Sequence, residues 1–175
     1  SNNALSLYLS RPINRRDYVL GKMAVLALLL SPITWMGGLL IFGLQAYLEG
    51  NGWGLDNWRI GMAYFVGHVT WIVVISLLSL AISAWVRFKP AARGALFGII
   101  FILAGFGEAI NAVTGSSIGD LIDLTLAIVN VVMSMFGGET QGTLPIAMNW
   151  LTLAATCLIS IWMLHRKLRA HEVVE

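Results

Sequence analysis

The chain has 175 residues, of which 58% are hydrophobic and 11% are charged, and its formal net charge is +2. Soluble domains carry about 25% charged residues, so this composition excludes an ordinary soluble protein and predicts a membrane protein. The small net charge gives no indication of nucleic-acid binding. Cys157 is the single cysteine, which excludes an internal disulfide and a cysteine-rich metal site.

The chain opens with a basic, amphipathic segment at residues 7–22, LYLSRPINRRDYVLGK, directly before a long apolar run. Such a segment is typical of a cytoplasmic elbow helix that leads into a membrane helix. Pro12 predicts a break between two short pieces, and Asn14 can cap the second piece.

Four apolar stretches are long enough to cross a bilayer, which needs about 20 residues. They are residues 23–47, 60–86, 94–113 and 146–164. Ser31-Pro32 predicts a kink in the first, because proline removes one backbone hydrogen bond. The sequence thus predicts an all-α, polytopic fold with a cytoplasmic N-terminal segment at 1–22, a transmembrane domain at 23–165 and a tail at 166–175. Tryptophans near the span ends are predicted interfacial anchors: Trp53, Trp58 and Trp150 at the outer interface, Trp85 and Trp162 at the inner one.

Residues 114–145 contain three acidic residues and no Lys or Arg. The polar residues of the apolar stretch 118–136 recur at helical spacing, which predicts an amphipathic helix in or on the outer leaflet. Ser117 and Asp120 fit a capping box at its start. A full span is the alternative, but it would place the basic C-terminal residues outside. The predicted polar stripe consists of Asp120, Asp123, Asn130 and Ser134.

The charge distribution predicts the orientation. Ten of the eleven Lys and Arg residues lie in the opening segment, in residues 87–93 or in the tail, and Arg59 is the exception. The positive-inside rule therefore predicts that both ends and the connection at residues 87–93 are cytoplasmic.

Polar residues within the second span share an arc of about 80° on a helix: His68, Ser76, Ser79 and Ser83. They could line a cavity, or they could serve helix packing with hydroxyls bonded to their own backbone. We favour the packing interpretation for these residues, because it is the commoner case.

In the third span, Glu108 shares an arc of about 80° with Gly94, Gly98 and Gly105. A glycine face favours close packing on a neighbouring helix, so Glu108 is expected to face protein or a wet cavity. It could line a transport path, or it could be hydrated near the outer interface. A pair between His68 and Glu108 is a hypothesis.

No motif predicts catalysis, a metal or a cofactor. Met23 follows Gly21-Lys22 where a phosphate-binding loop needs Ser or Thr, so the chain is not expected to hydrolyse ATP. His68, His165 and His171 are not spaced as metal ligands. Neither a Ser-His-Asp nor a Cys-His set is indicated by spacing.

The opening segment resembles the cytoplasmic segment before the third helix of ATP-binding-cassette permeases of the type-2 class. The matching residues are Tyr8-Leu9-Ser10-Arg11-Pro12, then Arg15 or Arg16, Tyr18 and Gly21-Lys22. The resemblance covers about sixteen residues, and the remaining hydropathy layout agrees with it. The family usually has six membrane helices and four are predicted here, so the resemblance implies two further helices ahead of these.

The resemblance implies a permease subunit of an ATP-driven transporter. A second permease subunit, identical or different, would complete the path. The segment 7–22 would dock on a separate ATPase subunit, and the residues that would bind this partner are Arg11, Pro12, Arg15, Arg16, Asp17, Tyr18 and Lys22. Binding of Arg11, Arg15 and Arg16 to anionic lipid headgroups is the simpler alternative for these charges. A structural or accessory subunit of a larger membrane complex is the alternative function. An intramembrane enzyme is the least favoured class, because no convergent nucleophile and base are present.

Overall fold

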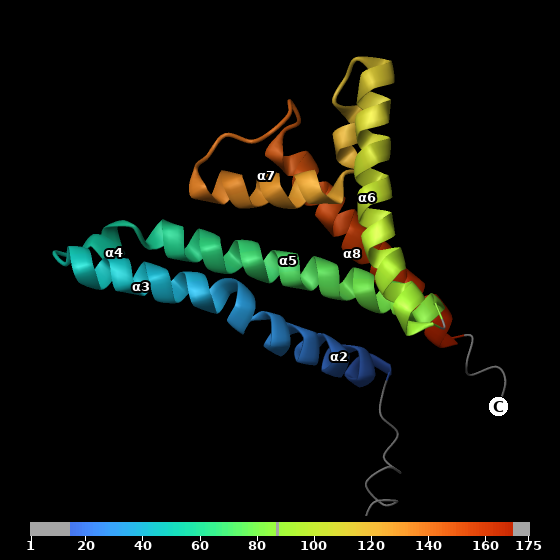
Figure 1. Cartoon of the computed structure of the whole chain (residues 1–175), viewed down its shortest axis with the longest axis horizontal. Coiled ribbons are helices and arrows are strands. Elements are labelled where there is room, and N and C mark those ends of the chain that lie inside the picture. Colours follow the sequence, from blue (N-terminus) through green and yellow to red (C-terminus); the bar gives the residue numbers. More distant parts are fainter. Residues whose placement is uncertain (1–14, 87, 170–175) are drawn as a thin grey trace, which may run out of the picture.

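The computed structural model describes residues 15–86 and 88–169, and all regular secondary structure in this part of the chain is helical (Figure 1). In chain order the elements are α2 (Arg15–Leu30), the π-helical turn η1 (Pro32–Met36), α3 (Gly37–Glu49), the single turn α4 (Trp53–Asp56), α5 (Trp58–Trp85), α6 (Lys89–Thr114), the 3-10 turn η2 (Ile118–Leu121), α7 (Leu124–Phe136) and α8 (Ile146–Arg169).

The four predicted spans are confirmed as four long apolar helical stretches among the described residues. They are Val19–Glu49, Trp58–Trp85, Pro90–Thr114 and Ile146–Lys167. The third helix begins at Lys89, earlier than predicted. Pro90 lies in the first turn of this helix. It is tolerated there because the N–H that proline lacks would have no partner within the helix. The connection between the first two predicted spans contains a helical turn, α4.

The kink predicted at Ser31-Pro32 is present as a local change of helix type within the first span. The chain turns at Ser31 and passes through η1, so that α2 and α3 lie at an angle to each other (Figure 1). Met36 N donates to the Ser31 carbonyl at 3.2 Å, five residues back, as in a π-turn. The hydroxyls of Ser31 and Thr34 donate to the carbonyls of Ala27 and Leu30 at 2.7 and 2.8 Å. These bonds give both hydroxyls a partner within their own helix, which lipid could not provide.

α5 is the central helix of the fold, with α2 and α3 packed on it from one side and α7 and α8 from the other (Figure 1). Two of its glycines leave room for side chains of its neighbours: Phe42 of α3 lies against Gly61, and Val132 of α7 lies against Gly67. The buried core lies between α5, α7 and α8 and consists of Val74, Leu124, Ala127, Val131 and Leu153.

The segment 114–145 differs from the predicted single amphipathic helix. It forms η2 and, after a break at Ile122–Asp123, α7, whose Ala127 and Val131 belong to the core. The predicted capping box at Ser117 is wrong, since the Ser117 side chain caps nothing and bonds to Thr143 instead. Asp123 is the cap, accepting from Leu126 N at 3.0 Å.

η2 turns back along α6 and packs on it by backbone contact. Gly107 of α6 and Gly119 of η2 face each other so closely that a Cβ on Gly107 would lie 2.7 Å from the Gly119 carbonyl oxygen. The Asn111 side chain fixes this contact, because its Oδ1 accepts from Gly119 N at 2.7 Å and its Nδ2 donates to Asp120 Oδ1 at 2.6 Å. We call Asn111, Gly107, Gly119 and Asp120 the η2 clamp.

Candidate functional site

The predicted coupling segment is described only from Arg15 onward. Arg11 and Pro12 lie outside the described residues, and so do the side chains of Arg15, Arg16 and Tyr18. From Arg15 the backbone is part of α2, which continues into the first span. Asp17 and Lys22 are exposed on its first turns, so this end of α2 offers charged groups to the surroundings.

Three of the four residues in the predicted polar stripe of α5 line two separate cavities. His68 faces a cavity of about 240 Å³ between η1, α5 and α7. Its lining residues are Thr34, Gly67, His68, Trp71, Ile128 and Val132. His68 Nδ1 donates to the Tyr64 carbonyl at 2.8 Å, because a carbonyl can only accept. The His68 and Tyr64 rings stack at 4.2 Å, which holds the imidazole against its own helix.

Ser79 and Ser83 line a second cavity, of about 250 Å³, between the C-terminal part of α5 and the first turns of α6. We call it the Arg93 cavity. Its lining residues are Ser79, Ser83, Ala92, Arg93, Leu96 and Phe97. Ser83 Oγ donates to the Leu80 carbonyl at 3.1 Å. The structure therefore places two of the predicted hydroxyls beside a guanidinium that was predicted only as part of a loop.

Ser76 is only 2% exposed, and its Oγ has no hydrogen-bond partner among the described residues. A buried hydroxyl without a partner costs about 1–3 kcal/mol in proteins. Ser76 lines neither cavity, so the structure gives it a packing position between helices.

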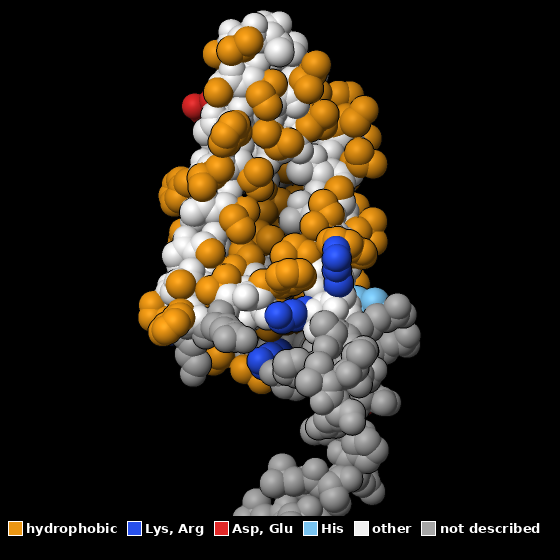
Figure 2. Space-filling view, turned by 90° about the vertical axis from the view of Figure 1, so that its right-hand side faces the viewer, with side chains coloured by type: hydrophobic (Ala, Val, Ile, Leu, Met, Phe, Trp, Pro, Cys, Tyr) orange, Lys and Arg blue, Asp and Glu red, His pale blue; other side chains and the backbone are white. Residues whose placement is uncertain are grey.

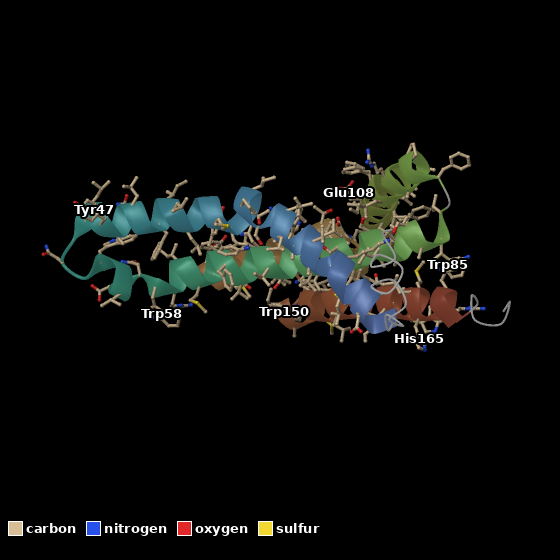
Figure 3. The ribbon with its side chains drawn as sticks, turned by 90° about the horizontal axis from the view of Figure 1, so that it is seen from below. Tyr47, Trp58, Trp85, Glu108, Trp150 and His165 are labelled. Carbon is tan, nitrogen blue, oxygen red and sulfur yellow. The ribbon has the colours of Figure 1, made fainter. Side chains whose placement is uncertain are left out.

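Glu108 is exposed on α6, and no ion pair joins it to His68 in the described part of the chain. Figure 3 shows it on the arm of the molecule formed by α6, away from the long axis of α3 and α5. A Cβ on Gly94, Gly98 or Gly105 would meet nothing within 4 Å. The predicted glycine face is therefore open within this chain, and Gly107 makes the close helix contact instead.

Sequence reasoning missed a polar connection between α7 and the segment after it. Asn130 is 1% exposed and binds the backbone of Gln141 twice: its Nδ2 donates to the carbonyl at 2.9 Å, and its Oδ1 accepts from the N–H at 2.7 Å. Asn149 Oδ1 lies 3.4 Å from the same Nδ2. An asparagine within an apolar helix was the available signal, but spacing alone could not identify the backbone that it binds.

Aromatic and basic side chains meet where α5 and α8 end. Trp85 Nε1 donates to the Met163 carbonyl at 3.3 Å, and Lys167 Nζ lies 5.4 Å from the Trp85 ring centre. Arg166 stands at the same distance, 5.4 Å, over Trp162. Tyr47 and Trp58 lie at the opposite end of the molecule from Trp85 and His165 (Figure 3). This layout suits the two edges of a membrane.

Among the described residues, no group of three or more His, Cys, Asp or Glu side chains is placed to hold a metal ion. Small cavities along α5 and the exposed, charged end of α2 are the candidate binding features of the described residues. Comparison with models of protein families, with curated proteins and with solved structures finds no match for this chain.

Proposed function

We propose that the chain is the membrane-spanning permease subunit of an ATP-driven transporter and couples to a separate ATPase through residues 7–22. The observation that carries this proposal is the order of Arg11-Pro12, Arg15-Arg16 and Gly21-Lys22 immediately before the first span. Four long apolar helices support a transmembrane role. The basic ends of the chain would be cytoplasmic, in a membrane of the bacterial inner-membrane type.

The bend in the first span suits such coupling. α2 carries the charged end, and η1 separates it from α3. A π-turn with Pro32 is a natural place for a helix to change direction. A force applied at Asp17 or Lys22 would tilt α2 about η1 while α3 remains packed on α5.

A second permease subunit would cover the open face of α6. Only 6% of the most apolar window of this span is buried within the chain. Glu108 is exposed there, although a carboxylate facing lipid is costly. A neighbouring helix packed on Gly98 and Gly105 would remove Glu108 from lipid. This supports a dimer, whether of identical or different permease chains.

The test is retention of an ATPase. The tagged chain is solubilised from its native membrane and captured, and co-purifying proteins with a phosphate-binding loop are identified by mass spectrometry. Arg11→Glu combined with Arg15→Glu is expected to abolish retention, because both changes reverse charges on the docking segment. Arg59→Glu is the matched control, since Arg59 lies at the far end of α5, and it should retain the ATPase fully.

Two results would contradict the proposal. The first is capture of no such ATPase by the unaltered chain. The second is equal retention by the charge-reversed variant, which would assign Arg11 and Arg15 to lipid headgroups. Co-purification with a stable membrane complex that lacks an ATPase would favour the alternative, an accessory subunit without transport activity. The largely uncovered first span, with none of its most apolar window buried, would fit either assembly.

A further inference from the structure

The Arg93 cavity lies where α5 ends and α6 begins, two helices joined by a connection of only a few residues. Ser79 and Ser83 line it from α5, while Ala92, Arg93, Leu96 and Phe97 line it from α6. It is therefore a notch between two spans at one end of the apolar region. Figure 2 shows Lys and Arg side chains gathered near this end of the molecule, below a mainly hydrophobic surface.

The polar groups around the notch are suited to an anion. Arg93 carries five N–H donors, and no ion pair is formed by it within the described residues. The Ser79 hydroxyl likewise makes no hydrogen bond there, whereas Ser83 bonds to its own helix at 3.1 Å. Arg93 also stands in the second turn of α6, near the positive end of the helix dipole. An anion bound here would compensate the charge of Arg93 and the partial positive charge of the helix N-terminus.

The apolar part of the notch continues away from Arg93 along α6. Leu96 and Phe97 complete the lining, and Phe97 and Phe101 are 62% and 73% exposed. Residues four apart share a helix face, so these rings form a ridge that leads into the apolar region. A ligand that matches this order has an anionic group beside Arg93 and a hydrocarbon chain beside Phe97 and Phe101.

We propose that the Arg93 cavity binds the phosphate group of an anionic phospholipid, with one acyl chain along the phenylalanine ridge of α6. Basic pockets between membrane helices near the membrane edge are known to suit such headgroups. The bound lipid would fasten the α5–α6 connection to the membrane. This site is separate from the proposed docking of an ATPase at residues 7–22, and it requires only that the chain spans a membrane.

The experiment measures lipid binding to the purified full chain in a neutral maltoside detergent. Phosphatidylglycerol with a fluorescent acyl chain is titrated against the protein, and phosphatidylcholine with the same chain serves as the comparison lipid. We expect saturable binding of phosphatidylglycerol and much weaker binding of phosphatidylcholine. Arg93→Gln should weaken phosphatidylglycerol binding about fivefold, the loss expected for one basic residue near a membrane surface.

Further variants separate the parts of the site. Ser79→Ala should weaken binding a fewfold, because one donor to the phosphate is lost. Phe97→Ala should weaken lipid binding but leave competition by inorganic phosphate unchanged. Arg59→Gln is the matched control and should bind as the unaltered chain does. If Arg93→Gln fails to fold, Ser79→Ala and Phe97→Ala still test the cavity. Arg93→Lys keeps the positive charge and should retain most of the affinity.

Three results would overturn the proposal. Equal affinity for phosphatidylglycerol and phosphatidylcholine would show that the protein does not select an anionic headgroup. If the unaltered chain, Arg93→Gln and Ser79→Ala bind phosphatidylglycerol with equal affinity, the lipid does not bind in the Arg93 cavity. Full displacement of the lipid by millimolar inorganic phosphate, with no effect of Phe97→Ala, would assign the cavity to free phosphate instead. Loss of ATPase retention in a variant that still binds lipid would bear on the proposed function alone.

Discussion

Replacing Gly119 by alanine is expected to destabilise the fold strongly, because it forces apart the backbones of η2 and α6. The added Cβ would lie 2.7 Å from Asn111 Oδ1 and closer still to the Gly107 carbonyl oxygen, whereas a carbon–oxygen contact needs about 3.3 Å. Overpacking costs about 1–3 kcal/mol. Losing both hydrogen bonds of Asn111 adds about 1 kcal/mol for each bond, so the free energy of unfolding should fall by about 3–5 kcal/mol.

The assay is unfolding of the purified chain in detergent, followed by the helical circular-dichroism signal. Gly43→Ala is the matched control, because Gly43 lies inside α3 with nothing within 4 Å of an added Cβ. It should be neutral or stabilise the chain by up to about 1 kcal/mol, since alanine is the better helix former. If Gly119→Ala and Gly43→Ala unfold at the same midpoint, the close contact between η2 and α6 is wrong.

Two further predictions concern the α7 connection and the orientation. Asn130→Leu should lower the free energy of unfolding by about 2–4 kcal/mol, because two backbone groups of Gln141 lose their partner. Chemical unfolding measures this loss. Ser134→Ala is the control, since it removes only a bond from the hydroxyl to its own helix. Cysteines placed at the exposed positions Leu55 and Phe88, in a chain with Cys157→Ser, should react with an impermeant maleimide from opposite sides: Leu55→Cys from outside intact cells, and Phe88→Cys only after lysis. Labelling of both from one side would refute the predicted topology.

The spans could be predicted from sequence because the bilayer imposes a simple requirement on length and polarity. The break at Pro32 followed from its missing N–H in the same direct way. These features depend on local chemistry alone, so no knowledge of the neighbouring helices was needed to predict them.

The candidate sites depend on which other segments pack against each helix. The periodicity of a single helix carries no information about those neighbours. Asn130 shared a predicted polar stripe, but the stripe meets the backbone of Gln141 rather than water. Gly107 was passed over in favour of Gly98 and Gly105, because only the return path of η2 determines which glycine is used. Arg93 was predicted to precede its span, and the earlier start of α6 at Lys89 places it on a helix and in a cavity.

The low burial of the outlying helices makes the amphiphile around this protein part of its stability. The most apolar window of α5 is 39% buried, but those of the first and third spans are 0% and 6% buried. Helix association in a bilayer gains little from hydrophobicity, because lipid tails are as apolar as leucine. Chain length and headgroup of the surrounding detergent or lipid should therefore shift the unfolding midpoint more than most point substitutions on α6 do, and solubilisation conditions should be chosen with that surface in mind.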